Sequence, residues 1–180
     1  MNLKFGRVLI LTVVMSLFLS ACGFKLRGDY NLPSNIKQLE LTAEQKNTPL
    51  YRNLRNQLEG FNIEVFDSHL KENITRDDID ARVYIKSDQL ERRLLSLFST
   101  GQVAEYELVY TIKYLIQFPN EEPQLQEFDV TREYQDDPDA VLAKSRELDL
   151  IQKEMRQTAA ARIINQLASF YTSWQQVKSQ

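Results

Sequence analysis

Residues 106–118 read YELVYTIKYLIQF, and this stretch decides the fold. Every second residue is apolar or aromatic, and most of the residues between them are polar. Side chains of a β-strand point alternately to its two faces, so this pattern predicts a long strand with one buried and one wet face. The residues on the buried face are Tyr106, Leu108, Tyr110, Ile112, Tyr114, Ile116 and Phe118.

Two neighbouring stretches show the same alternation. One run precedes residues 106–118 and alternates Ala81, Val83 and Ile85 with polar residues. This run could continue past residue 90, and it ends at the turn residues 99–101. After the turn at residues 120–123, a third run alternates Phe128, Val130, Arg132 and Tyr134. Three alternating runs joined by short turns predict an antiparallel meander with long hairpins.

The N-terminal side of this meander contains a helix between two short strands. Thr48-Pro49 is a helix-start signal, apolar residues continue at helical spacing through Leu58, and Gly60 is expected to end the helix. Residues 36–42 and 61–66 alternate well enough to predict strands.

A second, longer helix is expected to open at Asp136-Asp137-Pro138, with acids near its N-terminus and proline in its first turn. Its apolar stripe, from Leu148 to Trp174, keeps a spacing of three and four residues and predicts a face packed on the sheet. The expected class is therefore α+β, in the order β-α-β-β-β-α. A single, mostly antiparallel sheet of four or possibly five strands packs against two helices, in one domain over residues 36–175.

The N-terminus has the features of a secretory leader. Lys4 and Arg7 precede an apolar run over residues 8–19, and Leu19-Ser20-Ala21-Cys22 follows. This tetrapeptide resembles the lipobox of bacterial lipoproteins, which implies a signal peptide over residues 1–21 and lipidation of Cys22. Residues 22–35 would then be a tether to the membrane. The alternative is an ordinary signal peptide with a stray cysteine. In lipoproteins of this kind, Gly23 in place of an aspartate implies the outer membrane.

Composition excludes several functional classes. The chain has a formal net charge of −3, and loss of Lys4 and Arg7 with the leader makes the mature chain more acidic. This charge argues against a nucleic-acid partner, which would need a basic surface. We find no nucleophile motif, no phosphate-binding glycine loop and no metal-ligand spacing around the lone His69. We therefore expect no enzyme activity, no metal and no cofactor.

Several short motifs resemble the LPS-assembly lipoprotein family LptE, also called RlpB. They are CGFKLRG at residues 22–28, RNLRNQL at 52–58, GQVAEY at 101–106 and Ala143-Lys144. The resemblance implies a lipoprotein without enzymatic activity in the outer membrane, held inside the lumen of the LptD β-barrel in a 1:1 complex. Such a protein helps to assemble the barrel, binds lipopolysaccharide and delivers it to the outer leaflet.

The same resemblance suggests binding residues. One lipopolysaccharide-binding charge in the family is the lysine of the Ala-Lys pair, here Lys144. A second follows the phenylalanine at the hairpin tip, but here Ser99 follows Phe98 and that charge is missing. Arg92, Arg93 and Arg132 are candidate replacements. Without the resemblance, Lys144 would be interpreted as a solvated helix residue.

The hairpin tip is a candidate barrel contact. Leu94, Leu95, Leu97 and Phe98 precede the turn, and the predicted contact comprises Phe98, Ser99, Thr100 and Gly101. The alternative is that these apolar residues belong to the core. Two other functions stay open: a freestanding lipid-binding or chaperone lipoprotein, which predicts an open apolar groove, and a barrel scaffold that binds no lipopolysaccharide.

Overall fold

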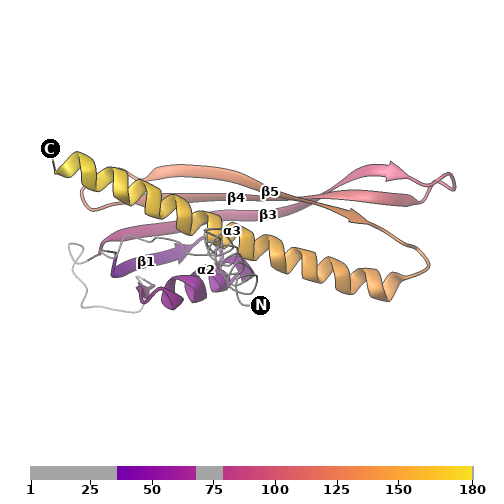
Figure 1. Ribbon diagram of the computed structural model, residues 1–180, viewed down its shortest axis with the longest axis horizontal. Coiled ribbons are helices and arrows are strands. Elements are labelled where there is room, and N and C mark those ends of the chain that lie inside the picture. The colour runs from indigo at the N-terminus through magenta and orange to yellow at the C-terminus, as the bar shows by residue number, and fades with distance from the viewer. Residues whose placement is uncertain (1–35, 68–78, 180) are drawn as a thin grey trace, which may run out of the picture. The chain divides into compact units, whose positions relative to one another are not determined.

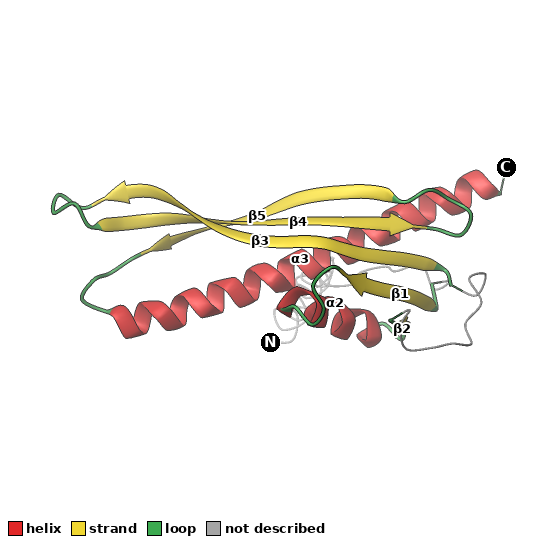
Figure 2. Cartoon of the chain, turned by 180° about the vertical axis from the view of Figure 1, so that it is seen from behind, coloured by secondary structure: helices red, strands yellow, loops and turns green. Residues whose placement is uncertain are grey.

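A five-stranded sheet carries two helices on one of its faces in the computed structural model, which describes residues 36–67 and 79–179 (Figures 1 and 2). The elements are β1 (Gln38–Ala43), α2 (Pro49–Gly60), β2 (Glu64–Phe66), β3 (Ala81–Leu97), β4 (Val103–Gln117), β5 (Gln124–Gln135) and α3 (Val141–Lys178). The predicted α+β class with two helices is confirmed, and the sheet has the larger of the two expected strand numbers. The leader over residues 1–21, Cys22, the rest of the tether and His69 lie outside the described residues.

The sheet is mixed, with strand order β2-β1-β3-β4-β5. β3, β4 and β5 form the predicted antiparallel meander. β1, however, pairs in parallel with both β2 and β3, a parallel half that the alternation did not indicate. The parallel β1–β2 pair follows from α2, because a helix between two adjacent strands carries the chain back to the starting edge.

The core lies between one face of the sheet and the two helices. From β4, Leu108, Ile112 and Tyr114 are fully buried. α2 contributes Leu50, Leu54 and Leu58 to the same cluster. α3 crosses the sheet diagonally in Figure 1 and contributes Met155, Ala159, Ala160, Ile163, Ile164, Leu167 and Tyr171. The fully buried residues of α3 all lie from Met155 onward, and Leu148 and Ile151 in the preceding turns are partly buried against the same core.

The ends of α2 follow the sequence signals with one difference. Thr48 Oγ1 accepts a hydrogen bond from the Tyr51 backbone N–H at 3.2 Å, and Pro49 is the first helical residue. Gly60 is the last helical residue, but the left-handed backbone conformation after the helix is at Asn62, with φ 60°. Asparagine tolerates this conformation better than most residues do, so the chain turns into β2 without a glycine.

α3 begins later than predicted. Asp136-Asp137-Pro138 does not open the helix, which starts at Val141 after Ala140. Asp137 Oδ1 instead accepts the Asp139 N–H at 3.0 Å, and the Asp137 carbonyl accepts the Ala140 N–H at 3.1 Å. An aspartate that bonds the backbone two residues on favours a turn, which delays the helix by one turn of chain.

β3 contains a bulge that changes which residues face the core. Ile85 pairs with Tyr114 and Ser87 with Lys113, so Lys86 has no partner on β4. Residues directly opposite each other on paired strands share a face. The inward residues of β3 are therefore odd-numbered up to Ile85 and even-numbered from Asp88 to Leu94.

The C-terminal part of α3 is fastened to the turn between β4 and β5. Trp174 stacks on Phe118 at 5.3 Å between ring centroids, and its Nε1 donates to Glu121 Oε1 at 3.3 Å. These contacts explain why the helix continues past Phe170. Within the residues that the structure describes, neither helix combines the length and apolar character needed to cross a membrane.

The cap of α2 supplies a first prediction. Thr48→Ala removes the acceptor of the Tyr51 N–H and should lower the free energy of unfolding by about 1 kcal/mol. The measurement is urea unfolding of the purified full chain, followed by circular dichroism. Thr172→Ala is the control, because Thr172 bonds only back to Ala168 inside α3, where alanine is the better helix former. Equal stability of the Thr48→Ala variant and the wild type would contradict the capping role.

A second prediction concerns alkaline stability. Burial raises the pKa of Tyr110 above its usual value, and the hydrogen bond that its phenol donates to Asp88 Oδ2 at 2.6 Å raises it further. The unfolded chain then releases this proton at lower pH than the folded chain does, so stability should fall as pH rises above about 10. Tyr110→Phe should reduce this fall. The measurement is urea unfolding from about pH 8 to pH 11, and identical pH dependence in the two proteins would contradict the prediction.

Candidate functional site

Two arginines share a row on the inner face of the sheet, toward the hairpin tip. In the strand register, Arg92 of β3 is opposite Leu108 of β4, which is opposite Arg132 of β5. Leu108 faces the core, so both arginines project from the face that carries the helices. Both arginine side chains are exposed, although Leu108 between them is fully buried.

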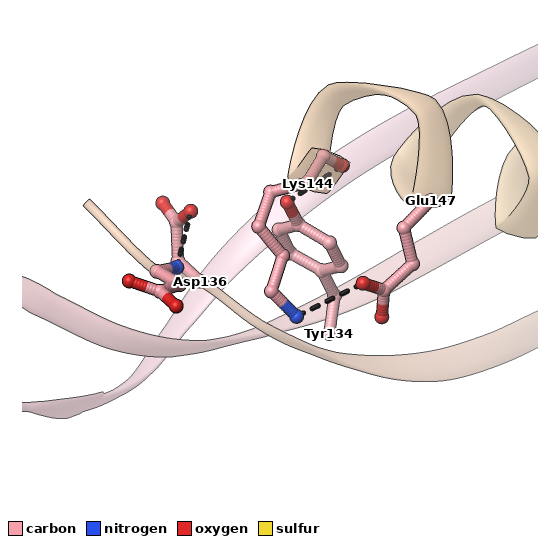
Figure 3. A network of polar contacts seen from close by, with 5 residues as sticks. Tyr134, Asp136, Lys144 and Glu147 are labelled. Atoms are coloured by element: carbon pink, nitrogen blue, oxygen red, sulfur yellow. Dashed lines mark hydrogen bonds and ion pairs between the residues drawn. The ribbon is translucent and has the colours of Figure 1, made fainter. Parts of the chain in front are cut away.

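A third cation approaches this row from the first turns of α3. Lys144 Nζ lies 5.5 Å from the centroid of the Tyr134 ring, and the Tyr134 hydroxyl donates to the Lys144 carbonyl at 2.9 Å (Figure 3). Tyr134 is in the row next to Arg132, opposite Tyr106. We call Arg92, Arg132 and Lys144 the basic patch.

Burial and four nearby charges shift the pKa of Tyr134. Burial raises the pKa of Tyr134 most, and the carboxylates of Asp136 and Glu147 raise it further. The positive charges of Lys144 and Arg92 act in the opposite direction. The cations that act on this pKa thus come from two elements, α3 and β3.

Lys144 is also paired with an acid on its own helix. Its Nζ donates to Glu147 Oε2 at 2.9 Å, one turn further along α3 (Figure 3). This hydrogen bond is the main cause that raises the pKa of Lys144. The Lys144 side chain is 21% exposed and that of Glu147 is 47% exposed, so the carboxylate is the more accessible partner.

Arg93 does not join the basic patch. It pairs with Glu107, whose side chain projects from the opposite face of β4, and it forms ion pairs with Glu91 at 3.5 Å and Glu107 at 3.9 Å. The bulge at Lys86 explains this difference between the two arginines, because it places Arg92 on the inner face and Arg93 on the outer one. The structure therefore brings together three of the four basic residues suggested by the sequence.

The tip of the β3–β4 hairpin presents apolar side chains to solvent. Phe98 is 45% exposed and Leu94 is 54% exposed, and Leu95 and Leu97 are similarly accessible, so these residues are not part of the core. The Phe98 N–H donates to the Gln102 carbonyl at 2.8 Å, which closes a loop of Ser99, Thr100 and Gly101. Gly101 has φ 83°, a conformation that a side chain would strain.

The chemistry available here is the recognition of an amphiphilic anion. Guanidinium and ammonium groups bind phosphate or carboxylate, and the exposed Leu94 lies on the same face one row from the arginines. Sequence reasoning missed Tyr134 and Glu147 as parts of this site. The alternation had placed Tyr134 on the inner face, and a spacing of three residues from Lys144 was the available signal for Glu147.

Comparison with known proteins decides the family. The model of a family described as LptE, lipopolysaccharide-assembly, matches residues 36–167. The chain belongs to the LptE family. The match spans every strand and both helices except the C-terminal turns of α3.

Curated LptE relatives agree over nearly the whole chain. The LPS-assembly lipoprotein LptE of Pectobacterium atrosepticum is 32% identical over 174 residues, 96% of this chain and 91% of the relative. The protein of the same name from Yersinia pestis is 29% identical over 93% of this chain and 78% of the relative. These relatives are named lipoproteins and not enzymes, in agreement with both expectations from the sequence.

Solved structures share the LptE fold. The crystal structure of rare lipoprotein B from Shewanella oneidensis is 37% identical, with a TM-score of 0.68, and covers 77% of this chain and 99% of that one. The solution structure of lipoprotein B from Nitrosomonas europaea is 28% identical, with a TM-score of 0.65, over 83% and 93% of the two chains. The five-stranded sheet with two helices is thus similar to experimental structures of lipoproteins.

Proposed function

We propose that this LptE-family protein acts in lipopolysaccharide assembly as an outer-membrane lipoprotein anchored through Cys22. It plugs the LptD β-barrel and helps to assemble it, binds lipopolysaccharide and delivers it to the outer leaflet. The family match and the names of the curated relatives support the general role. The single observation that supports lipopolysaccharide binding is the basic patch on the inner face of the sheet.

The patch has the chemistry that a phosphorylated lipid requires. Lipopolysaccharide carries phosphate groups next to acyl chains, and arginine and lysine donate charge-assisted hydrogen bonds to phosphate. Arg92 and Arg132 flank Leu108 in one row, and Lys144 lies over the adjacent Tyr134. Because the chain as a whole is acidic, this grouping is a local feature and not a general basic surface.

The departure at Ser99 fits this arrangement. The family's second basic residue would follow Phe98 in the hairpin loop, outside the strand pairing, where this chain has serine. Arg92 and Arg132 provide cations on the inner face in its place, one row from Tyr134, the residue that Lys144 contacts. The binding residues we propose are therefore Lys144, Arg92 and Arg132, without Arg93.

The plug role is supported by the surfaces of the domain. The face of the sheet away from the helices carries ion pairs and hydrogen bonds such as Lys113–Glu127 at 3.1 Å and Thr111–Asp129 at 2.6 Å, which suits a polar barrel lumen. The exposed Phe98 hairpin tip is the proposed barrel contact, with Ser99, Thr100 and Gly101.

A freestanding lipid carrier is less well supported than a plug. Such a carrier needs an open apolar groove between sheet and helices, but the space between the sheet, α2 and the second half of α3 is filled by a continuous buried cluster. A scaffold that binds no lipopolysaccharide is the remaining alternative, and the binding experiment below distinguishes it.

Charge reversal of the patch tests lipopolysaccharide binding. The variant Arg92→Glu, Arg132→Glu, Lys144→Glu should lower the affinity of the purified full chain for lipopolysaccharide by about tenfold or more, since three charge-assisted contacts become repulsive. The measurement is capture of labelled lipopolysaccharide in non-ionic detergent, with circular dichroism as the check of folding.

Arg93→Glu is the matched control for this experiment, because it reverses the neighbouring charge on the opposite face of β3. Binding by this control should stay within about twofold of wild type, the range of a screened surface charge. Equal binding by the triple variant and the wild type would contradict the assigned site. A wild-type chain that does not bind lipopolysaccharide would favour the scaffold.

Photo-crosslinking tests the barrel contact. A photoreactive amino acid in place of Phe98 should yield a covalent adduct with a large outer-membrane β-barrel protein in intact cells, because the exposed tip would touch the lumen wall. The exposed Val177 near the end of α3 is the second probe position. If neither position yields an adduct, the freestanding lipoprotein is favoured. An adduct from position 177 alone would overturn the assignment of the hairpin tip as the barrel contact.

A further inference from the structure

The ammonium group of Lys144 forms an ion pair with the carboxylate of Glu147. Its Oε2 lies 2.9 Å from Lys144 Nζ, so a phosphate that binds this ammonium group meets a carboxylate already in place (Figure 3). We propose that Glu147 is a displaceable counter-ion that determines how tightly, and for how long, the basic patch holds a phosphate-bearing amphiphile. This inference rests on the proposed binding of lipopolysaccharide at the patch.

The two partners of this ion pair are held very differently. The backbone of Lys144 is fixed by the hydrogen bond from the Tyr134 hydroxyl, and its ammonium group lies 5.5 Å from the Tyr134 ring centroid. Tyr134 itself is buried on β5. The Glu147 side chain is 47% exposed and can rotate into solvent. When an anion arrives, Lys144 therefore stays and Glu147 moves.

The neighbouring acids do not offer the same exchange. Asp136 Oδ1 accepts the Asp137 N–H at 2.9 Å, and Asp137 Oδ1 accepts the Asp139 N–H at 3.0 Å. These carboxylates stabilise the turn before α3, and their displacement would disturb the backbone. Glu147 makes a contact with Lys144 between side chains on one helix, where a change of rotamer suffices.

Electrostatics give the direction of the effect. An ion pair with one well-exposed partner contributes little stability, so an incoming phosphate, which carries more negative charge than a carboxylate, can displace Glu147. The released carboxylate stays near the patch and repels the bound anion, which lowers affinity. When the anion leaves, the carboxylate returns to Lys144. A protein that passes a lipid on to another site benefits from this limit on its affinity, because the lipid must also be released.

The variant Glu147→Gln tests this role, since it removes the charge and keeps the size and helix propensity of the side chain. We expect the full chain in detergent to bind lipopolysaccharide about two- to fivefold more tightly, mainly through slower dissociation. Affinity for lipid A from which both phosphates have been removed should not change. Glu154→Gln, on the same helix and two turns away, is the matched control and should behave like wild type.

The outcomes separate this inference from the proposed function. If wild-type binding depends on Lys144 but Glu147→Gln binds and releases lipopolysaccharide as wild type does, the counter-ion role is wrong and the binding site stands. If reversal of Lys144 leaves binding unchanged, the binding site itself is wrong. An equal gain for lipid A without phosphates would show that Glu147 acts on structure and not on charge, which would also overturn the inference.

Discussion

The packing of β4 between β3 and β5, with one face against the helices, is the constraint on which the remaining structure depends. Its inward residues alternate without interruption from Tyr106 to Ile116, and each pairs with a residue on both neighbouring strands. β4 therefore defines which face of the sheet is buried. A shift of one residue in the pairing would turn every side chain of β3 or β5 to the other face of the sheet. The pairing with β4 therefore also determines which charged residues lie on the same face as the core.

The bulge at Lys86 shows how this constraint acts on function. Up to Ile85, burial of Ala81, Val83 and Ile85 fixes the register of β3. Beyond that point one extra residue exchanges the faces, so Arg92 and Leu94 are on the inner face and Arg93 is on the outer one. Without the bulge, Arg93 would lie on the inner face of the sheet, the face that carries the helices. The membership of the basic patch thus depends on one unpaired backbone residue six positions before Arg92.

The sequence contained most of the fold and only part of the site, for physical reasons that differ by element. Alternation along residues 106–118 and the Thr48-Pro49 cap are local signals, and the structure confirms the strand and the cap that they predict. The bulge lies in a polar stretch, KSDQ at residues 86–89, where neither parity has an apolar pattern that would expose a change of face. Strands as short as β1 and β2 show the same pattern in parallel and antiparallel pairing, so only the tertiary structure distinguishes them.

The start of α3 illustrates how a competition between local options affects the site. Asp136-Asp137-Pro138 can cap a helix or form a turn, and the ladder bond from the Asp136 N–H to the Ala104 carbonyl at 2.9 Å extends β5 far enough to favour the turn. The helix therefore begins at Val141, which puts Lys144 in its first turns beside Tyr134. A cation there is opposed by the helix dipole, whereas Glu147 one turn later compensates the charge of Lys144. The position of the helix start thus explains both why Lys144 meets the arginines of the sheet and why it is paired with a carboxylate that a stronger anion can replace.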